Sequence, residues 1–264
     1  MSQFTNCIIP DKIYGFEDNK EYDFSIILEM PNLTSLDINL GENVRLKDYS
    51  ILKKLNKLQM LTIGNINDSD INNISCLTSL EWLDISNSKI TNINFLRDLK
   101  QLTFFGLDNV PDVHDFQPLK SLTEIKQINL INMGLTQKEL DTIPDMDTIE
   151  SLSLFSNDIK SIDNFPQMKN LQYLVLENNP LISVNIVSDR TPNLKSLMLN
   201  NTRMSDLNEL SGIENIERIY IKGTQIRKIS PLKKFKNLKE IYADTKNIDD
   251  LDQFKDSLII YENY

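Results

Sequence analysis

Apolar residues recur along the chain in a Leu-x-x-Leu-x-Leu pattern whose intervening positions are mostly polar. Within each unit the spacing of the apolar residues changes from two to three, which predicts a short strand followed by a tight helical or 3₁₀ return. The first apolar positions of successive units lie 22 to 25 residues apart, at Leu33, Leu58, Leu80, Leu102, Ile125, Ile149, Leu171, Leu194, Ile216 and Leu238. The chain is therefore predicted to be a repeat protein.

The repeat pattern decays at both ends of the chain. Residues 1–32 are predicted to be an N-terminal cap, because a degenerate unit can be traced back to Asp11. Residues 33–257 form the repeats, and residues 258–264 form a closing segment in which Leu258 to Ile260 supply a last strand. Caps are expected because the exposed end of a stacked core would aggregate. The whole chain is thus predicted to be a single domain.

Neighbouring units must share one core, because a single unit cannot bury its apolar face alone. We therefore predict an α/β solenoid: a right-handed arc of about eleven units, with a concave parallel β-sheet and short helical or 3₁₀ segments on the convex side. Eight residues after the first apolar position stand side chains that can bond to the backbone of the turn, at Ser88, Asn157, Asn179, Thr202 and Thr224.

This pattern resembles the 22-residue class of leucine-rich repeats found in bacterial internalins and in the leucine-rich-repeat regulatory subunit of protein phosphatase-1. The resemblance covers about Asp11 to Ile260 and implies a concave sheet that binds another protein. The sequence begins without a secretory signal and ends without a Leu-Pro-x-Thr-Gly sorting signal, so the cytoplasm is the expected location. The alternative is a cell-surface adhesin or receptor of the internalin type whose leader and anchor have been removed.

The charge balance narrows the class of partner. The chain has 28 Lys and Arg against 38 Asp and Glu, a formal net charge of -10, which repels nucleic acid and anionic membranes. No stretch approaches the roughly 20 apolar residues of a membrane helix. We therefore expect a monomer whose partner is another protein with a basic or neutral surface. The basic stretch from Arg227 to Lys239 is interpreted as a solvated outer face.

The residues that most enzymes need are scarce. The only histidine, His114, is expected on a return, and the seven glycines form no phosphate-binding loop. Asp84 and Asp108 are expected on neighbouring strands, but no apolar pocket is predicted that would make them an acid and base pair. The two cysteines, Cys7 and Cys76, are expected to be buried free thiols. We predict no catalytic site, metal or cofactor.

The strand register predicts which side chains face away from the core. Side chains two, four and six residues after the first apolar position point outward on the concave face, because side chains alternate along a strand. Trp82 is expected to point to solvent between Met60 and Phe104. The predicted partner-binding residues are Met60, Trp82, Asp84, Phe104, Asp108, Phe155, Tyr173, Glu177, Met198, Arg218, Tyr220 and Tyr242.

The residue types on this face favour binding of a partner, because Trp, Tyr, Met and Arg are enriched at interfaces. The alternative is that the aromatic side chains only stack along the sheet and stabilise it. Acidic side chains outnumber basic ones on the face, which favours a partner that is basic around an apolar centre. The expected function is a protein-binding scaffold or inhibitor, and a purely structural spacer is a further alternative.

Overall fold

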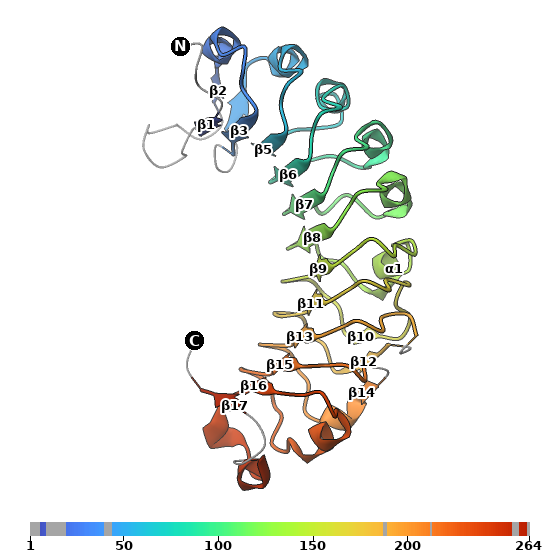
Figure 1. Ribbon diagram of the computed structural model, residues 1–264. Helices are drawn as coiled ribbons and strands as arrows, with labels where there is room; N and C mark the ends of the chain where they lie inside the picture. The colour runs from blue at the N-terminus through green and yellow to red at the C-terminus, as the bar shows by residue number, and fades with distance from the viewer. Residues whose placement is uncertain are drawn as a thin grey trace. The chain divides into compact units, whose positions relative to one another are not determined.

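The computed structural model describes residues 6–8, 20–39, 44–186, 189–211, 213–254 and 259–262. The chain divides into two compact units, which are residues 1–127 and 128–264. Within each unit, short parallel strands lie along one side and the returns lie on the other (Figure 1). The predicted α/β solenoid, with its parallel sheet and short returns, is confirmed.

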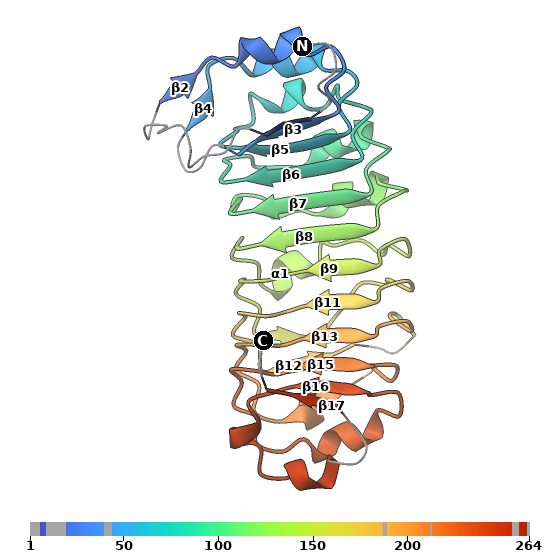
Figure 2. The same ribbon diagram turned by 60° about the vertical axis from the view of Figure 1, so that its left-hand side comes forward.

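The first unit has a sheet of regularly spaced parallel strands, with each return forming a 3₁₀ helix. The strands lie in the order β1 (Asn6–Ile8), β3 (Ser35–Ile38), β5 (Met60–Gly64), β6 (Trp82–Ser86) and β7 (Phe104–Asp108). The returns are η1 (Ser25–Glu29), η2 (Tyr49–Lys54), η3 (Ile71–Asn73), η4 (Asn94–Asp98) and η5 (Gln117–Ser121). A separate parallel pair, β2 (Glu21–Tyr22) and β4 (Arg45–Leu46), lies to one side of the sheet (Figure 2).

The second unit continues the same strand-and-return plan. Its strands are β8 (Gln127–Ile131, beginning at the unit boundary), β9 (Ser151–Ser153), β11 (Tyr173–Val175), β13 (Ser196–Met198), β15 (Arg218–Tyr220), β16 (Glu240–Tyr242) and β17 (Ile259–Tyr261). The helical returns are α1 (Gln137–Leu140), η6 (Leu207–Glu209), η7 (Ser230–Lys234), η8 (Thr245–Asn247) and η9 (Leu251–Phe254). The strand β17 lies in the predicted closing segment, whose Leu258 is outside the described residues.

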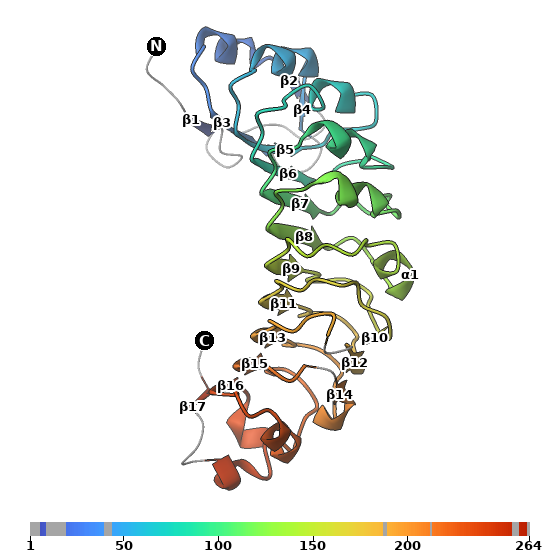
Figure 3. The same ribbon diagram turned by 45° about the vertical axis from the view of Figure 1, so that its right-hand side comes forward.

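Three returns of the second unit contain strands, a feature that the repeat pattern did not predict. The strands β10 (Ser161–Ile162), β12 (Ser183–Asn185) and β14 (Leu210–Ser211) form a second parallel sheet on the side away from β11, β13 and β15 (Figure 3). Ile162, Val184 and Leu210 are paired across it and fully buried. These returns therefore use an alternating apolar pattern in place of a helical one.

The predicted register is correct throughout both units. Every residue at the first apolar position is buried, from Leu33 at 1% exposed to Leu238 at 8%. The neighbouring strands pair without a slip, so that Leu83 lies between Leu61 and Phe105 in the core. A slip of one residue would have moved these side chains to the opposite face.

The turns that follow β5, β6, β7, β8, β9, β11, β13 and β15 each contain a residue with left-handed backbone geometry. Seven of them have φ between 47° and 57° and are Asn65, Asn87, Asn109, Asn132, Ser156, Asn178 and Asn201, while the next unit has Gly223 with φ 66°. Asparagine tolerates this region better than most residues. The amide of Asn109 also donates to Oδ1 of Asn87 at 2.8 Å, and Asn201 donates to Asn178 at 2.8 Å. Neighbouring turns are thus joined by side chains.

The five polar residues that were predicted to bond to turn backbone do so: Ser88, Asn157, Asn179, Thr202 and Thr224. Ser88 donates to the Ser86 carbonyl at 2.6 Å and accepts from the Ile66 N–H at 3.1 Å. Asn157 bonds with five backbone groups, which belong to Leu130, Leu154, Phe155, Met133 and Leu135. Because these groups lie away from water, the polar residues satisfy bonds that the turn would otherwise leave unmade.

Two predictions concern the N-terminal part of the chain: the buried thiols and the N-terminal cap. Cys76 is exposed, so the expectation of a buried thiol is wrong at this position. It lies in a turn whose Ile74 and Leu77 side chains fill the core, which leaves Cys76 on the outer side. The side chain of Cys7, together with residues 1–5 and 9–19 of the predicted cap, lies outside the described residues.

Candidate protein-binding surface

The outward face of the first unit's sheet carries an apolar row across three neighbouring strands. Met60, Trp82 and Phe104 are paired in register. The rings of Trp82 and Phe104 are stacked, with centroids 3.5 Å apart and planes 7° from parallel. Met60 is 44% exposed and Trp82 is half-buried. We call these three residues, together with Asp84 and Asp108, the unit 1 patch.

Phe104 differs from the expectation of a solvent-facing side chain. It lies on the predicted face, but only 4% of it is exposed. One face of its ring is covered by Trp82, and the ring edge leans over Gly106, where an added Cβ would lie 3.2 Å from Cε1. Stacking along the sheet therefore explains why Phe104 is buried, while Met60 and Trp82 remain accessible.

Carboxylates lie beside this apolar row. Asp84 is half-buried, and its pKa is raised to about 6 by burial first and then by the negative charges of Asp108 and Asp37. Burial also raises the pKa of Asp108. Neither Asp84 nor Asp108 forms an ion pair with a residue in the described part of the chain. The patch therefore holds negative charge that no described cation compensates.

The raised pKa of Asp84 predicts a dependence of stability on pH. Burial penalises the charged carboxylate, so the stability present below about pH 4 is lost as the pH rises through about 6. Asp84→Asn is expected to remove this loss and to make the protein more stable than wild type at neutral pH by about 1 to 2 kcal/mol, after allowance for solvent screening. Urea unfolding at acidic and neutral pH measures the difference.

The control for this prediction is Asp112→Asn, which changes the net charge equally at an exposed position on a return of the same unit. It is expected to leave the dependence of stability on pH unchanged. Equal stabilisation by both variants would mean that overall charge repulsion, and not burial of Asp84, is responsible.

The outward face of the second unit carries a column of tyrosines. Tyr220 and Tyr242 stack with ring centroids 4.2 Å apart, and Tyr242 and Tyr261 stack at 4.6 Å. Tyr242 is the middle ring and only 8% of it is exposed. Tyr261 was not among the residues predicted from the sequence. Continuing the register from Tyr242 into the closing strand would have found it, because the two residues are paired.

The charged residues predicted on this face are largely held by internal bonds. Glu240 accepts from Nε of Arg218 at 3.2 Å and from the hydroxyl of Tyr242 at 2.8 Å. Burial and the bond to Glu240 raise the pKa of Tyr242. Glu177 accepts from the amide of Asn200, and burial raises the pKa of its carboxyl. Arg218 is therefore already neutralised within the protein.

The remaining predicted residues of this face differ in their exposure. Tyr173 is 41% exposed, and Met198 and Phe155 are half-buried. Met198 pairs with Tyr220 on one side and with Val175 on the other. The structure thus places Tyr173, Met198 and Tyr220 on one surface, while Phe155 lies just after the end of β9.

Comparisons with known proteins agree with this geometry. The leucine-rich repeat family model matches residues 132–224. An internalin (inlF) from Listeria monocytogenes has a similar structure, with a TM-score of 0.51 and 19% identity over 83% of this chain and 70% of that one. This is a leucine-rich-repeat fold. No curated protein sequence matches the chain.

Two solved complexes also contain a similar structure. In the TLR13–ssRNA13 complex, the match has a TM-score of 0.63 and 20% identity over 84% of this chain. In the Toll–Spatzle complex from Drosophila, it has a TM-score of 0.64 and 18% identity over 85%. This chain spans 34% and 32% of the matched chains, about a third of their length. At these identities the likeness concerns the fold.

Among the described residues, no cluster of three or more His, Cys, Asp or Glu side chains is arranged to hold a metal ion. His114 is exposed on the return after β7. In the described part of the chain, helices of the length and apolar character needed to cross a bilayer are likewise absent.

Proposed function

We propose that this leucine-rich-repeat protein is a protein-binding scaffold or inhibitor, not an enzyme, and that it engages its partner through the outward face of its strands. The observation that carries the proposal is the accessible Met60 beside the stacked pair of Trp82 and Phe104. Leucine-rich-repeat folds typically serve as scaffolds for protein interactions. The complex of Toll with Spatzle fits this use of the fold.

Rigidity supports a role for Trp82 in binding. Its ring is held by Phe104, so little side-chain freedom remains to be lost when a partner covers it. Large aromatic side chains held in this way are frequent among the residues that dominate binding energy. Tyr173, Met198 and Tyr220 supply similar residue types on the second unit.

The charges of the unit 1 patch indicate a basic partner surface. Asp84 is half-buried and Asp108 is exposed, and neither pairs with a cation in the described part of the chain. A Lys or Arg side chain of a partner would relieve the repulsion between them. The net charge of -10 also disfavours nucleic acid, so the RNA bound by TLR13 is not a guide to this ligand.

The proposal predicts that Trp82→Ala weakens partner binding by about 2 kcal/mol, close to 30-fold, because a central aromatic anchor is lost. A partner isolated with the wild-type protein would be titrated against each variant by calorimetry. The control is Ile182→Ala, which removes an equally apolar side chain that is 56% exposed away from the strand face. A partner that binds Trp82→Ala as tightly as wild type would contradict the proposal.

A further inference from the structure

A cavity with basic walls lies in the first unit, at the turns that end β5 and β6. Its volume is about 270 Å³, and its polar walls come from Lys20, Glu21, Arg45, Asn65, Asn87 and Lys89. Asn65 and Asn87 are left-handed turn residues, whereas Glu21 and Arg45 come from β2 and β4, and Lys20 directly precedes β2. The cavity is therefore separate from the outward face of the sheet.

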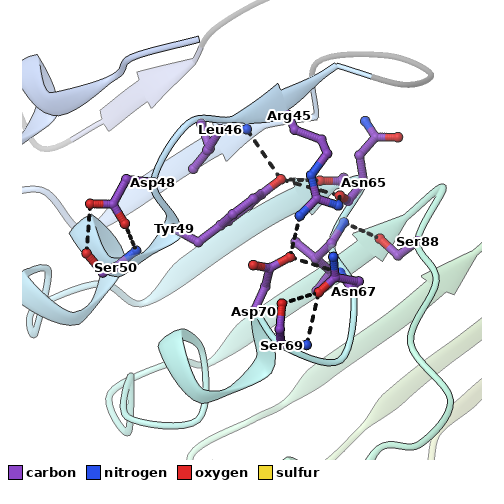
Figure 4. Close-up of polar contacts among 12 residues, drawn as sticks. Arg45, Leu46, Asp48, Tyr49, Ser50, Asn65, Asn67, Ser69, Asp70 and Ser88 are labelled. Carbon is purple, nitrogen blue, oxygen red and sulfur yellow. Dashed lines mark hydrogen bonds and ion pairs between the residues drawn. The ribbon is translucent and has the colours of Figure 1, made fainter. Parts of the chain in front are cut away.

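One wall of the cavity is fixed by bonds to Arg45 (Figure 4). Its guanidinium donates to the Asn65 carbonyl at 2.7 Å and forms a 2.7 Å ion pair with Asp70. The same group lies over the ring of Tyr49, 5.3 Å from its centroid. Asp70 is buried and also accepts from the Asn67 N–H at 3.0 Å. This wall is preorganised, because its polar atoms are held before any ligand arrives.

The cavity also presents donors that the described residues do not use. Oδ1 of Asn87 accepts from Asn109, which leaves the NH₂ group of Asn87 to donate elsewhere. The ammonium of Lys89 is exposed and pairs with no carboxylate in the described part of the chain. Both side chains line the cavity. A bound group would therefore meet hydrogen-bond donors.

The described side chains that line this cavity carry a net positive charge, opposite in sign to that of the whole protein. Among the described residues that line it, Lys20, Arg45 and Lys89 are basic and Glu21 is acidic, in a chain whose net charge is -10. Asp70 lies behind the wall and pairs with Arg45. The volume lies just below the range of about 300 to 1,000 Å³ for pockets that hold whole small molecules. A compact anion with several acceptor oxygens matches both the size and the donors.

We propose that this cavity is an oxyanion site that binds a phosphate group, either as the free ion or as the phosphate of a small monoester. Lys89 and the Asn87 amide would donate to the phosphate oxygens, while Lys20 and Arg45 supply further positive charge. Glu21, at the exposed rim, opposes binding by repulsion. The site acts independently of the partner surface on the strands.

Calorimetric titration of the full chain with inorganic phosphate tests the proposal at constant ionic strength, and O-phosphoserine is titrated separately. Saturable binding to one site is expected, and tighter binding of O-phosphoserine would identify a monoester as the preferred source. Lys89→Gln is expected to weaken binding by about fivefold, which corresponds to the upper end of the range for an ion pair between exposed charges. Glu21→Gln is expected to strengthen it, because it removes the repulsive carboxylate.

Two charge-matched controls separate a site from a general charge effect. Lys53→Gln changes an exposed lysine on η2, and Glu29→Gln changes an exposed glutamate at the end of η1, neither of which lines the cavity. Both are expected to leave phosphate affinity unchanged. The proposal is overturned if neither phosphate nor O-phosphoserine binds saturably, or if the controls shift affinity as much as the cavity variants. Thermal unfolding of each variant verifies that it is folded.

Discussion

Replacing Asn157 with alanine is expected to lower the free energy of unfolding by about 3 to 5 kcal/mol. Its side chain donates to three backbone carbonyls at 2.8 to 3.2 Å and accepts from the N–H groups of Met133 and Leu135 at 3.0 and 3.1 Å. Asn157 is only 4% exposed, so water has little access to these groups. Alanine would leave several buried donors and acceptors without partners, and each typically costs about 1 to 3 kcal/mol.

Urea unfolding followed by circular dichroism measures this loss, with Thr202→Ala as the matched control. Thr202 occupies the same place in a later repeat, is 3% exposed, and donates one bond, to the Leu199 carbonyl at 2.8 Å. Its replacement is expected to cost only about 1 kcal/mol. Equal losses of stability in the two variants would contradict this prediction. They would mean that the turn backbone groups near Asn157 find other hydrogen-bond partners once the side chain is removed.

Leu83→Ala is expected to destabilise the protein by about 2 to 5 kcal/mol, because it leaves a cavity in a close-packed core. Leu83 is fully buried between Leu61 and Phe105 on the neighbouring strands. The adjacent Trp82 points to the opposite face and is half-buried. Trp82→Ala is therefore expected to cost less, about 1 kcal/mol, mainly from the lost stacking on Phe104.

Thermal and urea unfolding of Leu83→Ala and Trp82→Ala under the same conditions test this difference. Phe104→Ala is a useful third variant, because its ring lies on the outward face but is only 4% exposed. It is expected to fall between the other two in its effect on stability. A loss for Trp82→Ala as large as that for Leu83→Ala would show that the outward face contributes to folding as strongly as the core does.

The sequence alone determined the repeat, the register and the direction of the side chains in the strands that begin each repeat. The apolar positions recur every 22 to 25 residues, and a shift of one residue would expose the whole core. Local chemistry also predicted the polar residues that satisfy the turns, because Ser88 and Asn157 occupy equivalent places in their units. These features depend on positions within one repeat and its neighbour, so they can be counted along the chain.

Tertiary structure decided how much of each outward side chain remains accessible and which charges are already paired. The register placed Phe104 and Arg218 on the outward face, but only the packing of neighbouring strands shows Phe104 covered by Trp82 and Arg218 bound to Glu240. The cavity beside Arg45 likewise is lined by residues from different repeats. These features depend on side-chain rotamers and on contacts across strands. A hydrophobic pattern predicts which face a side chain points to, but it does not predict the rotamer or the contacts.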